Sequence, residues 1–449
     1  MRSNILSKYL RSVPRYTSYP TAPHFTPEVN ADRYREWLVG LDEATPLSLY
    51  LHIPFCRSLC WFCGCRMQVA NSYDPIQRYL KLLLNEIALV ANVLSRCPPV
   101  SHIHLGGGTP TMLSARDLAS LANTLRNHFD IEANAEFAVE IDPRVLTESH
   151  AIALGASGVN RASLGVQDFA PVVQKAINRI QPYEVTARAV EMLRSHNVSS
   201  INLDLMYGLP YQTVEGVVAT VERAVRLDPD RLAVFGYAHV PWMKRHQRLI
   251  PEEALPRPEE RTLQAAAAAS ALDAHGYVPI GLDHFARPSD PLVAALTSGR
   301  LRRNFQGYTA DRAETLIGFG VSAIGTLPDG YVQNASDSRA YGEAIARGEL
   351  ATARGIALAD DDRLRRDIIQ SLMCKFEAPV DAFCRAYGRE PGSLESERRT
   401  VAAMVADGLV TWDGGKLRVT AKGRPLVRVI CAAFDRYLTS GEAGHSVAV

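Results

Sequence analysis

Short apolar runs alternate along the chain with longer segments in which apolar residues recur every three or four positions. The short runs have the length of strands, and the periodic segments are typical of helices with one buried face. The expected strands are Ser48–Ile53, His102–Leu105, Phe137–Ile141, Ala162–Val166, Ile201–Met206 and Leu232–Val240. The expected helices are one that begins at Asp74, with an apolar stripe reaching Leu94, and the segments Ala115–His128, Tyr183–Ser195, Val214–Arg226 and Glu259–His275.

This order of elements predicts the fold class. Strands that alternate with helices favour parallel pairing with right-handed crossovers. At least six such units indicate an α/β fold, either a full or a partial β/α barrel. A doubly wound open sheet is the main alternative.

Polar and glycine residues follow the predicted strands at the point where each ends. They include the cysteine run after Ile53, Gly106–Thr109, Glu140, Gln167 and Asp204. Each alone is more often an ordinary loop residue. Because ligands bind at the carboxyl ends of parallel strands in both candidate folds, we expect these residues to converge on one site.

The two ends of the chain depart from this pattern. With prolines at 14, 20 and 23, residues 1–40 are expected to form an extended segment lying over a partial barrel of residues 41–354. Residues 355–449 are expected to form a mainly helical domain. Its helices are Asp362–Phe376, Glu397–Ala406 and Pro425–Tyr437, with a hairpin over Thr411–Thr420. Helices with a hairpin resemble a winged helix, but no basic stripe accompanies them, so a structural or lid role is favoured over nucleic-acid binding.

Composition narrows the classes of partner. The chain has 449 residues, is 47% hydrophobic and carries a formal net charge of +1. Nothing in that balance favours a nucleic acid or an anionic membrane. No apolar stretch has the length of a signal peptide or a membrane span, so we expect a soluble, cytoplasmic protein.

The eight cysteines are unevenly placed. Four of them, Cys56, Cys60, Cys63 and Cys65, fall within ten residues, which is typical of metal binding or redox chemistry rather than of a disulfide framework. The scattered cysteines are expected to be small buried residues: Cys97, Cys374, Cys384 and Cys431.

Three thiolates on one short loop can hold three irons of a four-iron cube and leave the fourth iron open. Structural zinc is the alternative, but it commonly uses two separated pairs of ligands, and no second pair follows here. A closed cluster with four thiolates is awkward, because only one residue separates Cys63 from Cys65.

The spacing Cys56-x3-Cys60-x2-Cys63, with Phe62 before the third cysteine, resembles the signature of radical S-adenosylmethionine (SAM) enzymes. More narrowly, the chain resembles the oxygen-independent coproporphyrinogen III oxidases from about residue 10 to its C-terminus. The matching stretches are Arg15–Phe25, Leu49–Cys65, Leu105–Thr111, Glu140–Arg144, Ser163–Phe169, Asn202–Pro210, Tyr237–Trp242, Asp283–Pro288 and Asn304–Thr309. The resemblance implies a partial barrel of the radical SAM type.

The resemblance also implies a set of cofactor residues. Cys56, Cys60 and Cys63 would ligate a [4Fe-4S] cluster whose open iron binds the amino and carboxylate groups of SAM. Further contacts to SAM would come from Gly107, Gly108, Thr109, Tyr50, Phe62, Glu140, Gln167, Arg179, Asp204, Ala238 and Ile324. Cys65 would lie near a second SAM molecule, with a packed free thiol as the alternative. Buried salt bridges and core packing are the alternatives for the charged and the apolar residues of this set.

The activity implied by the resemblance is the oxidative decarboxylation of two propionates of coproporphyrinogen III to vinyl groups. It would use a 5′-deoxyadenosyl radical, yield protoporphyrinogen IX and belong to haem biosynthesis. A small electron-donor protein of the flavodoxin or ferredoxin type would be the partner, and the chain is expected to be a monomer. The alternatives are a haem-binding chaperone without decarboxylase activity and a binding or electron-transfer protein with a structural metal.

The substrate's carboxylates need cationic partners. Candidates are Lys244, Arg245, His246, Arg248, Arg302 and Arg303, for which a solvated basic face is an equally good interpretation.

Overall fold

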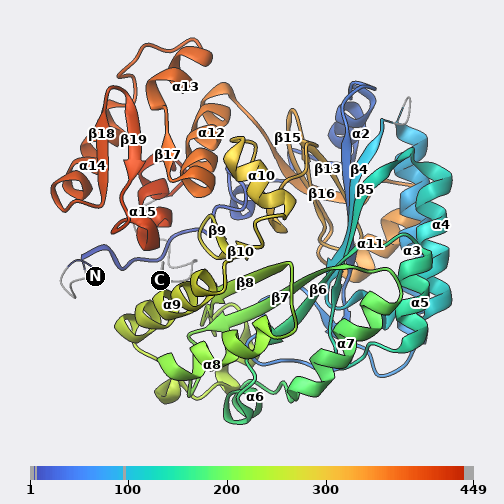
Figure 1. Cartoon of the computed structure of the whole chain (residues 1–449). Helices are drawn as coiled ribbons and strands as arrows, with labels where there is room; N and C mark the ends of the chain where they lie inside the picture. The colour runs from blue at the N-terminus through green and yellow to red at the C-terminus, as the bar shows by residue number, and fades with distance from the viewer. Residues whose placement is uncertain (1–4, 6–7, 95–97, 439–449) are drawn as a thin grey trace.

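The computed structural model describes residue 5, residues 8–94 and residues 98–438. Within them, a mixed sheet of twelve strands has the order β16-β15-β14-β13-β1-β4-β5-β6-β7-β8-β10-β9 (Figure 1). Its parallel part contains β1 (Leu47–Ile53), β4 (Val100–Gly107), β5 (Ile131–Ile141), β6 (Arg161–Gln167), β7 (Ser200–Tyr207) and β8 (Arg231–Gly236). One edge adds β13 (Thr315–Phe319), β14 (Ile324–Leu327), β15 (Gly330–Asn334) and β16 (Thr352–Ala357), and the other adds β10 (His284–Ala286) and β9 (Val278–Ile280).

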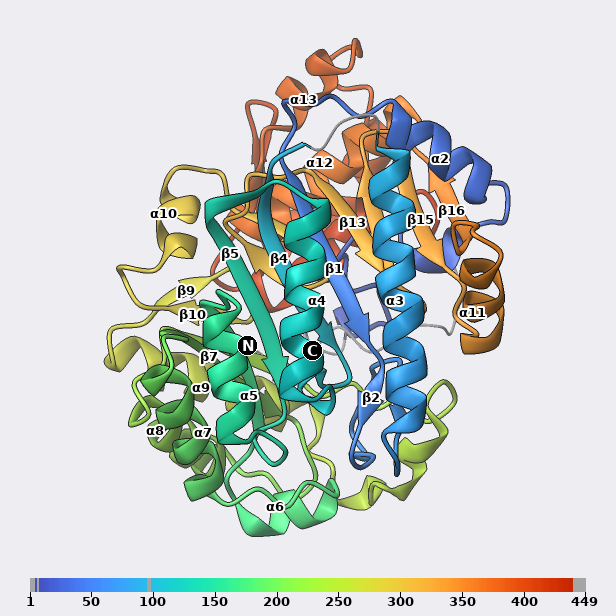
Figure 2. The same cartoon turned by 90° about the vertical axis from the view of Figure 1, so that its right-hand side faces the viewer.

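The strand order decides between the two predicted architectures. From β1 to β8 each parallel strand lies beside the next one along the chain, so the sheet grows in one direction without reversing. A doubly wound sheet would reverse at a switch point. Helices α3 (Asp74–Val93), α4 (Ala115–His128), α5 (Glu148–Ala156), α7 (Tyr183–Ser195) and α8 (Val214–Val225) cover the outside of the curved sheet (Figures 1 and 2). The partial β/α barrel is confirmed.

Alternation along the strands places apolar residues outside and polar residues inside the barrel. In β1, Leu47, Leu49, Leu51 and Ile53 share one core with the apolar stripe of α3. The intervening Ser48, Tyr50 and His52 face the other side of the sheet, since successive side chains of a strand alternate. The barrel interior is therefore lined by polar side chains that can meet a ligand.

The C-terminal part of the chain forms a second core. It contains α12 (Asp360–Lys375), β17 (Glu377–Ala378), α13 (Val380–Ala386), α14 (Glu395–Ala406), β18 (Val410–Asp413), β19 (Lys416–Val419) and α15 (Val427–Cys431), at the upper left of Figure 1. Tyr9, Val13, Tyr16 and Tyr19 pack into this core, so the two ends of the chain are stabilised together.

Smaller elements connect these parts. They are η1 (Ala22–His24), α2 (Ala31–Val39), β2 (Phe55–Cys56), β3 (Gln68–Val69), α6 (Pro171–Ala176), η3 (Arg245–Leu249), α9 (Pro258–Ala274), α10 (Pro291–Thr297), β11 (Arg302–Asn304), β12 (Gly307–Thr309) and α11 (Ser338–Ala346). No helix in the described ranges combines the length and apolar character that a membrane crossing requires. Cys374, Cys384 and Cys431 are buried as predicted, and Cys97 lies outside the described residues.

Three predicted elements need correction. The segment expected to be extended contains helix α2, whose N-terminus is capped by the Asn30 side chain 3.1 Å from the amides of Asp32 and Arg33. The strand expected to reach Val240 ends at Gly236. The helix expected over Pro425–Tyr437 is only α15 with a 3₁₀ turn on each side, because the Asp435 carboxylate accepts a bond from the Tyr437 amide (3.0 Å) and ends the helical run.

Candidate functional site

The cysteine loop leaves the barrel directly after β1. Strands β2 and β3 pair in parallel, with Cys56 opposite Val69, and hold the two ends of this loop side by side. Buried Gln247 donates hydrogen bonds to the carbonyl oxygens of Phe62 (3.0 Å) and Ala238 (3.2 Å), which fixes the loop to the segment after β8. These contacts to its backbone hold the cysteine loop in place.

A cavity at the carboxyl ends of the strands brings together most of the predicted site residues. Those that line it are Cys56, Cys60, Phe62, Cys63, Cys65, Gly107, Gly108, Glu140, Gln167, Arg179 and Asp204. They come from the cysteine loop, from the ends of β4, β5 and β6, from the segment after α6 and from β7. The convergence expected from the strand ends is thus what the fold produces.

Two arginines donate hydrogen bonds to one of the cysteine sulfurs. Arg144 Nη2 lies 3.4 Å and Arg179 Nη1 3.5 Å from Cys60 Sγ. The same arginines contact Asp142, which lies 2.6 Å from Arg144 Nη2 and 3.4 Å from Arg179 Nη2. Burial alone would raise the pKa of Asp142, but the two guanidinium groups outweigh it and lower that pKa.

Asp142, Arg144 and Ser163 also line the cavity, and the sequence interpretation did not assign them a role there. A signal was available for the first two, because they follow Glu140 at the end of a predicted strand, within a stretch that carried the resemblance. Ser163 likewise begins a stretch, Ser163–Phe169, that carried the resemblance.

The thiols differ in their readiness to bind metal. A hydrogen bond from the Cys65 thiol lowers the pKa of Cys63 to about 7, whereas burial raises the pKa of Cys56 to about 12. Of the two neighbours Cys63 and Cys65, Cys63 therefore ionises first, and the thiol of Cys65 donates the hydrogen bond. A bound metal would itself ionise the thiols that ligate it, so Cys56 can also serve as a ligand although its pKa is raised.

The residues fit a cubane cluster better than a single ion. Among the residues that the structure describes, no three His, Cys, Asp or Glu side chains gather closely enough to hold one metal ion. A cube presents a separate iron to each thiolate, so its ligands need not meet at one point. Hydrogen bonds to the ligating sulfurs, such as those to Cys60, are a usual feature of such clusters.

The glycine turn after β4 closes one side of the cavity. Gly107 adopts a positive φ of 112°, and its amide donates to Glu140 Oε2 at 3.0 Å. A Cβ on Gly108 would lie 2.4 Å from the carbonyl oxygen of Phe55, so only glycine fits against β2. The turn places open backbone beside the cysteine loop.

Two partly exposed carboxylates, Glu140 and Asp204, face the same cavity, and their pKa values shift in opposite directions. His104 Nε2 donates to Glu140 Oε1 (3.1 Å), and this bond with that of Gly107 lowers the pKa of Glu140 against the effect of burial. Asp204 accepts from Ser163 Oγ and Asn202 Nδ2 at 2.8 Å each, yet burial raises its pKa. Glu140 can therefore bind an ammonium group, and Asp204 can bind hydroxyl groups.

Four predicted residues do not line this cavity. Tyr50 lies behind it and donates to His52 Nδ1 (2.9 Å), while Thr109 is buried and its hydroxyl accepts from the Asp142 amide (3.0 Å). Ala238 contributes a carbonyl to the Gln247 bond. Ile324 packs in a separate apolar cluster with Phe25 and Tyr331.

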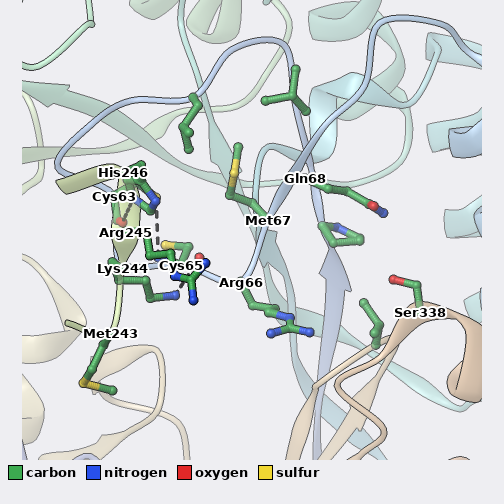
Figure 3. Close-up of a pocket in the computed structure, with 14 residues that line it drawn as sticks. Cys63, Cys65, Arg66, Met67, Gln68, Met243, Lys244, Arg245, His246 and Ser338 are labelled. Carbon is green, nitrogen blue, oxygen red and sulfur yellow. Dashed lines mark hydrogen bonds between the residues drawn. The ribbon is translucent and has the colours of Figure 1, made fainter. Parts of the chain in front are cut away.

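A second pocket shares Cys63, Cys65 and Met67 with the first and opens beside η3 (Figure 3). Lys244 Nζ lies 3.2 Å from the Cys65 carbonyl oxygen, and His246 Nε2 lies 2.7 Å from that of Cys63. Arg66 and Arg245 point into the same region, so this pocket is strongly basic.

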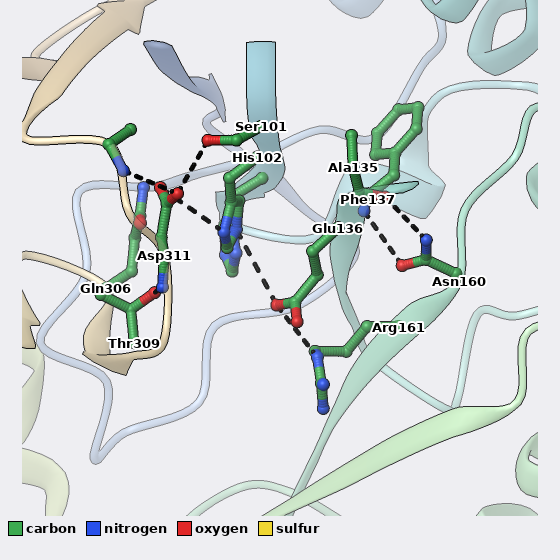
Figure 4. Close-up of polar contacts among 12 residues, drawn as sticks. Ser101, His102, Ala135, Glu136, Phe137, Asn160, Arg161, Gln306, Thr309 and Asp311 are labelled. Carbon is green, nitrogen blue, oxygen red and sulfur yellow. Dashed lines mark hydrogen bonds and ion pairs between the residues drawn. The ribbon is translucent and has the colours of Figure 1, made fainter. Parts of the chain in front are cut away.

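The opposite end of the barrel interior carries charged side chains of its own (Figure 4). Glu136 lies 3.0 Å from Arg161 Nε and 4.0 Å from His102 Nε2, and His102 Nδ1 lies 3.9 Å from Asp311. Charges of opposite sign therefore lie within 4.0 Å of one another at this end of the barrel interior.

Comparisons with known proteins place this geometry in a family. Residues 50–224 match the model of the radical SAM superfamily. The chain is 51% identical to the oxygen-independent coproporphyrinogen III oxidase of Bradyrhizobium diazoefficiens over all of both chains. It is 42% identical to that of Pseudomonas aeruginosa, over 98% of this chain and 96% of the relative. The solved structure of coproporphyrinogen III oxidase from Escherichia coli, a radical SAM enzyme, superposes with a TM-score of 0.90 at 39% identity, covering 95% of this chain and 100% of that one.

Proposed function

The chain belongs to the oxygen-independent coproporphyrinogen III oxidases of the radical SAM superfamily, and from that premise we propose that Cys56, Cys60 and Cys63 hold its [4Fe-4S] cluster. The protein is a coproporphyrinogen dehydrogenase of haem biosynthesis. It decarboxylates two propionates of coproporphyrinogen III to vinyl groups and yields protoporphyrinogen IX. The observation that carries this conclusion is 51% identity to a curated oxidase from end to end.

The chain's own residues prepare the site for this chemistry. A bound cluster would supply one electron for radical chemistry on SAM, and the residues that line the cavity would hold both groups and exclude water. Arg144 and Arg179 donate to Cys60 Sγ and so stabilise its negative charge. Phe62 packs in an apolar cluster with Val173 and Tyr237, which excludes water from one wall of the cavity.

SAM is held by groups of matching charge. Glu140 binds the ammonium group and Arg179 the carboxylate, while Gly107 and Gly108, which have no side chains, let the methionine part lie close to the backbone. Asp204 and Gln167, which also line the cavity, accept and donate hydrogen bonds to the ribose. Four further residues support this cavity without lining it: Tyr50, Thr109, Ala238 and Ile324.

A second SAM molecule lies near Cys65. The basic pocket beside η3 supports this part of the proposal, because it shares Cys65 with the cluster cavity and presents Lys244 and Arg245 to a carboxylate.

The partner that supplies the electron is a small acidic carrier of the flavodoxin or ferredoxin type. Trp242 and Met243, which are 57% and 58% exposed, lie next to Lys244 and Arg245 close to the cysteine loop. An exposed apolar patch with a basic rim is suited to a transient acidic partner. The chain acts as a monomer in the cytoplasm, where its free thiols stay reduced.

An anaerobic assay tests this function. The protein with SAM and dithionite is expected to convert coproporphyrinogen III, measured as fluorescence of the oxidised porphyrins, and to release 5′-deoxyadenosine. Cys56→Ala is expected to lose both bound iron and turnover. Release of 5′-deoxyadenosine without vinyl products would favour the haem-chaperone alternative, and Cys56→Ala with full iron content would refute the ligand assignment.

A further inference from the structure

Four arginines from distant parts of the chain lie near one another, and three of them interact with the charge of one carboxylate. Arg15 comes from the N-terminal segment, Arg261 from α9, Arg303 from β11 and Arg428 from α15. The carboxylate is Asp283, whose Oδ1 lies 3.8 Å from Arg303 Nη1. The charges of Arg303 and Arg15 and the bond from His284 lower the pKa of Asp283 to about 2, against the effect of burial.

The arginine with the tightest surroundings lacks hydrogen-bond partners. Arg303 is 7% exposed and lies 4.7 Å over the ring of Tyr308, and its Nε and Nη1 atoms make no hydrogen bond. Arg261 donates to the Tyr237 carbonyl oxygen (2.7 Å), but its buried Nε has no hydrogen-bond partner. Such N–H groups are costly to bury unless an acceptor reaches them.

The remaining two arginines add positive charge to the same place. Arg15 donates to the Gly236 carbonyl oxygen at 3.3 Å, and its side chain is exposed to solvent. Burial and the charges of Arg15 and Arg303 lower the pKa of Arg428 to about 10. The carboxylate of Asp283 acts on Arg15, Arg303 and Arg428, so one carboxylate interacts with several guanidinium groups.

The cluster adjoins the cysteine cavity. The strand register places Asp204 of β7 opposite Ala233 of β8, and Ala233 opposite His284 of β10. Asp204 lines the cavity, and His284 is bonded to Asp283 at 2.7 Å. Asp204 in the cavity and His284 beside the arginines are therefore separated by a single strand, β8.

We propose that Arg15, Arg261, Arg303 and Arg428 bind the carboxylate groups of a tetrapyrrole in the barrel. The inference rests on the proposed function, since coproporphyrinogen III carries four propionates. A guanidinium group binds a carboxylate through two parallel hydrogen bonds, and the unbonded N–H groups of Arg261 and Arg303 can provide such bonds. The C-terminal region and the N-terminal segment each contribute one arginine, so they complete the substrate site as well as cover it.

The neighbouring Arg302 gives a matched control. It precedes Arg303 on β11, but its side chain is 33% exposed and pairs with exposed Glu314. Successive residues of a strand point to opposite faces, so Arg302→Gln removes the same charge from the same strand without entering the cluster.

The test measures the affinity of the cluster-loaded protein for coproporphyrin III, the stable oxidised tetracarboxylate, by anaerobic absorbance titration. Arg303→Gln and Arg428→Gln are each expected to weaken binding at least about tenfold, and Arg302→Gln to leave it unchanged. Mesoporphyrin IX, with two carboxylates, should bind the wild type more weakly than coproporphyrin III does, and the two variants should lose part of this preference.

Thermal unfolding separates binding from a structural role. Because the cluster concentrates like charges, Arg428→Gln should melt no lower than the wild type, with its iron content retained. Arg15→Gln, at the solvent-reached position, provides a further variant with little risk to folding. Unchanged affinity in Arg15→Gln, Arg303→Gln and Arg428→Gln, or an equal loss in Arg302→Gln, overturns the proposal.

The binding measurements test the arginine cluster separately from the enzymatic activity. If the wild type converts coproporphyrinogen III and the arginine variants bind coproporphyrin III as tightly as the wild type does, the proposed role of the arginine cluster is refuted. The proposed function is then retained. A wild type that binds through the cluster without forming vinyl products would overturn the function alone.

Discussion

At the scale of single residues, the barrel interior contains two kinds of charged side chain: those that form ion pairs with one another and those that we propose bind the substrate. Glu136 is of the first kind, since it lies 3.0 Å from Arg161 and 3.9 Å from Arg231 Nη2. The arginine cluster around Asp283 is of the second kind. The contrast separates the end of the interior that stabilises the fold from the part that serves the substrate.

Glu136→Gln is expected to lower the melting temperature at pH 7, at a cost of up to about 3 kcal/mol. Arg161 loses its nearer carboxylate and is left with Asp290 at 3.9 Å, while Arg231 loses a partner additional to Asp290, which lies 2.8 Å away. The pKa of Glu136 is lowered to about 2 by these arginines and His102, which outweigh burial. Its contribution to stability is therefore present above the unfolded-state pKa and is lost as pH falls from about 4.5 towards 2.

Thermal melts of wild type and variant between pH 7 and pH 3.5 check this dependence. The difference in melting temperature should shrink as the pH falls below 4.5. Glu314→Gln, at an exposed carboxylate, should melt like the wild type at every pH. A gap for Glu136→Gln that stays constant with pH would contradict the assigned ion pairs.

The sequence predicted individual site residues well where they follow a strand. Glu140, Gln167 and Asp204 each stand at or near the end of a predicted run, and parallel pairing alone brings them together. Ile324 could not be placed this way, because it lies on a short antiparallel strand, β14, and the rule for the carboxyl ends of parallel strands does not apply to it. The cluster around Asp283 was also hidden, since its four arginines are dispersed over more than 400 residues of sequence.

At the scale of elements, the glycine turn after β4 positions the cysteine loop. Gly108 donates to the Ile53 carbonyl oxygen (2.8 Å) and leaves no room for a side chain against Phe55. The turn and β2 therefore depend on each other, and Cys56 is the second residue of β2.

Gly108→Ala is expected to displace β2 at a cost of about 1–3 kcal/mol and to reduce the iron bound per chain. Melting temperature and iron content of the reconstituted protein measure the two effects. Gly216→Ala in α8 is the control, because a Cβ there meets only Thr213 Oγ at 3.4 Å, and alanine in a helix should raise stability slightly. Normal iron content in Gly108→Ala would show that the turn does not position Cys56.

Helices and strands of the barrel were predicted closely because each has a local apolar period; α4 and α7 begin and end at the predicted residues. The antiparallel strands β14, β15 and β16 were missed, since they are short and gain their stability from neighbours rather than from alternation. Helix α15 ends early because the Asp435 side chain accepts a hydrogen bond from the Tyr437 amide. The spacing of apolar residues cannot indicate such a bond.

At the scale of the whole molecule, the N-terminal segment and the C-terminal core are a single unit. Buried Tyr16 donates to Asp435 Oδ2 (3.0 Å), and Tyr19 Oη accepts from the Arg436 amide (3.0 Å). These contacts place Arg15 and Arg428 in the same cluster although 412 positions lie between them in sequence.

Tyr16→Ala is expected to lower the melting temperature by several degrees, because removing a buried aromatic side chain costs about 3–5 kcal/mol. It should also weaken coproporphyrin III binding, since Arg15 loses its support. Tyr16→Phe should retain most of both properties. Lys8→Ala, which removes an exposed partner of Asp407, should change neither, and a Tyr16→Ala protein that melts like the wild type would contradict the shared core.

The central claim is that three thiolates hold a cluster with one iron open to SAM. Electron paramagnetic resonance of the anaerobically reconstituted, dithionite-reduced protein, with and without SAM, tests it most directly. The account predicts the signal of a reduced four-iron cluster that changes shape when SAM is added. Bound zinc in place of iron, or a cluster signal indifferent to SAM, would contradict it.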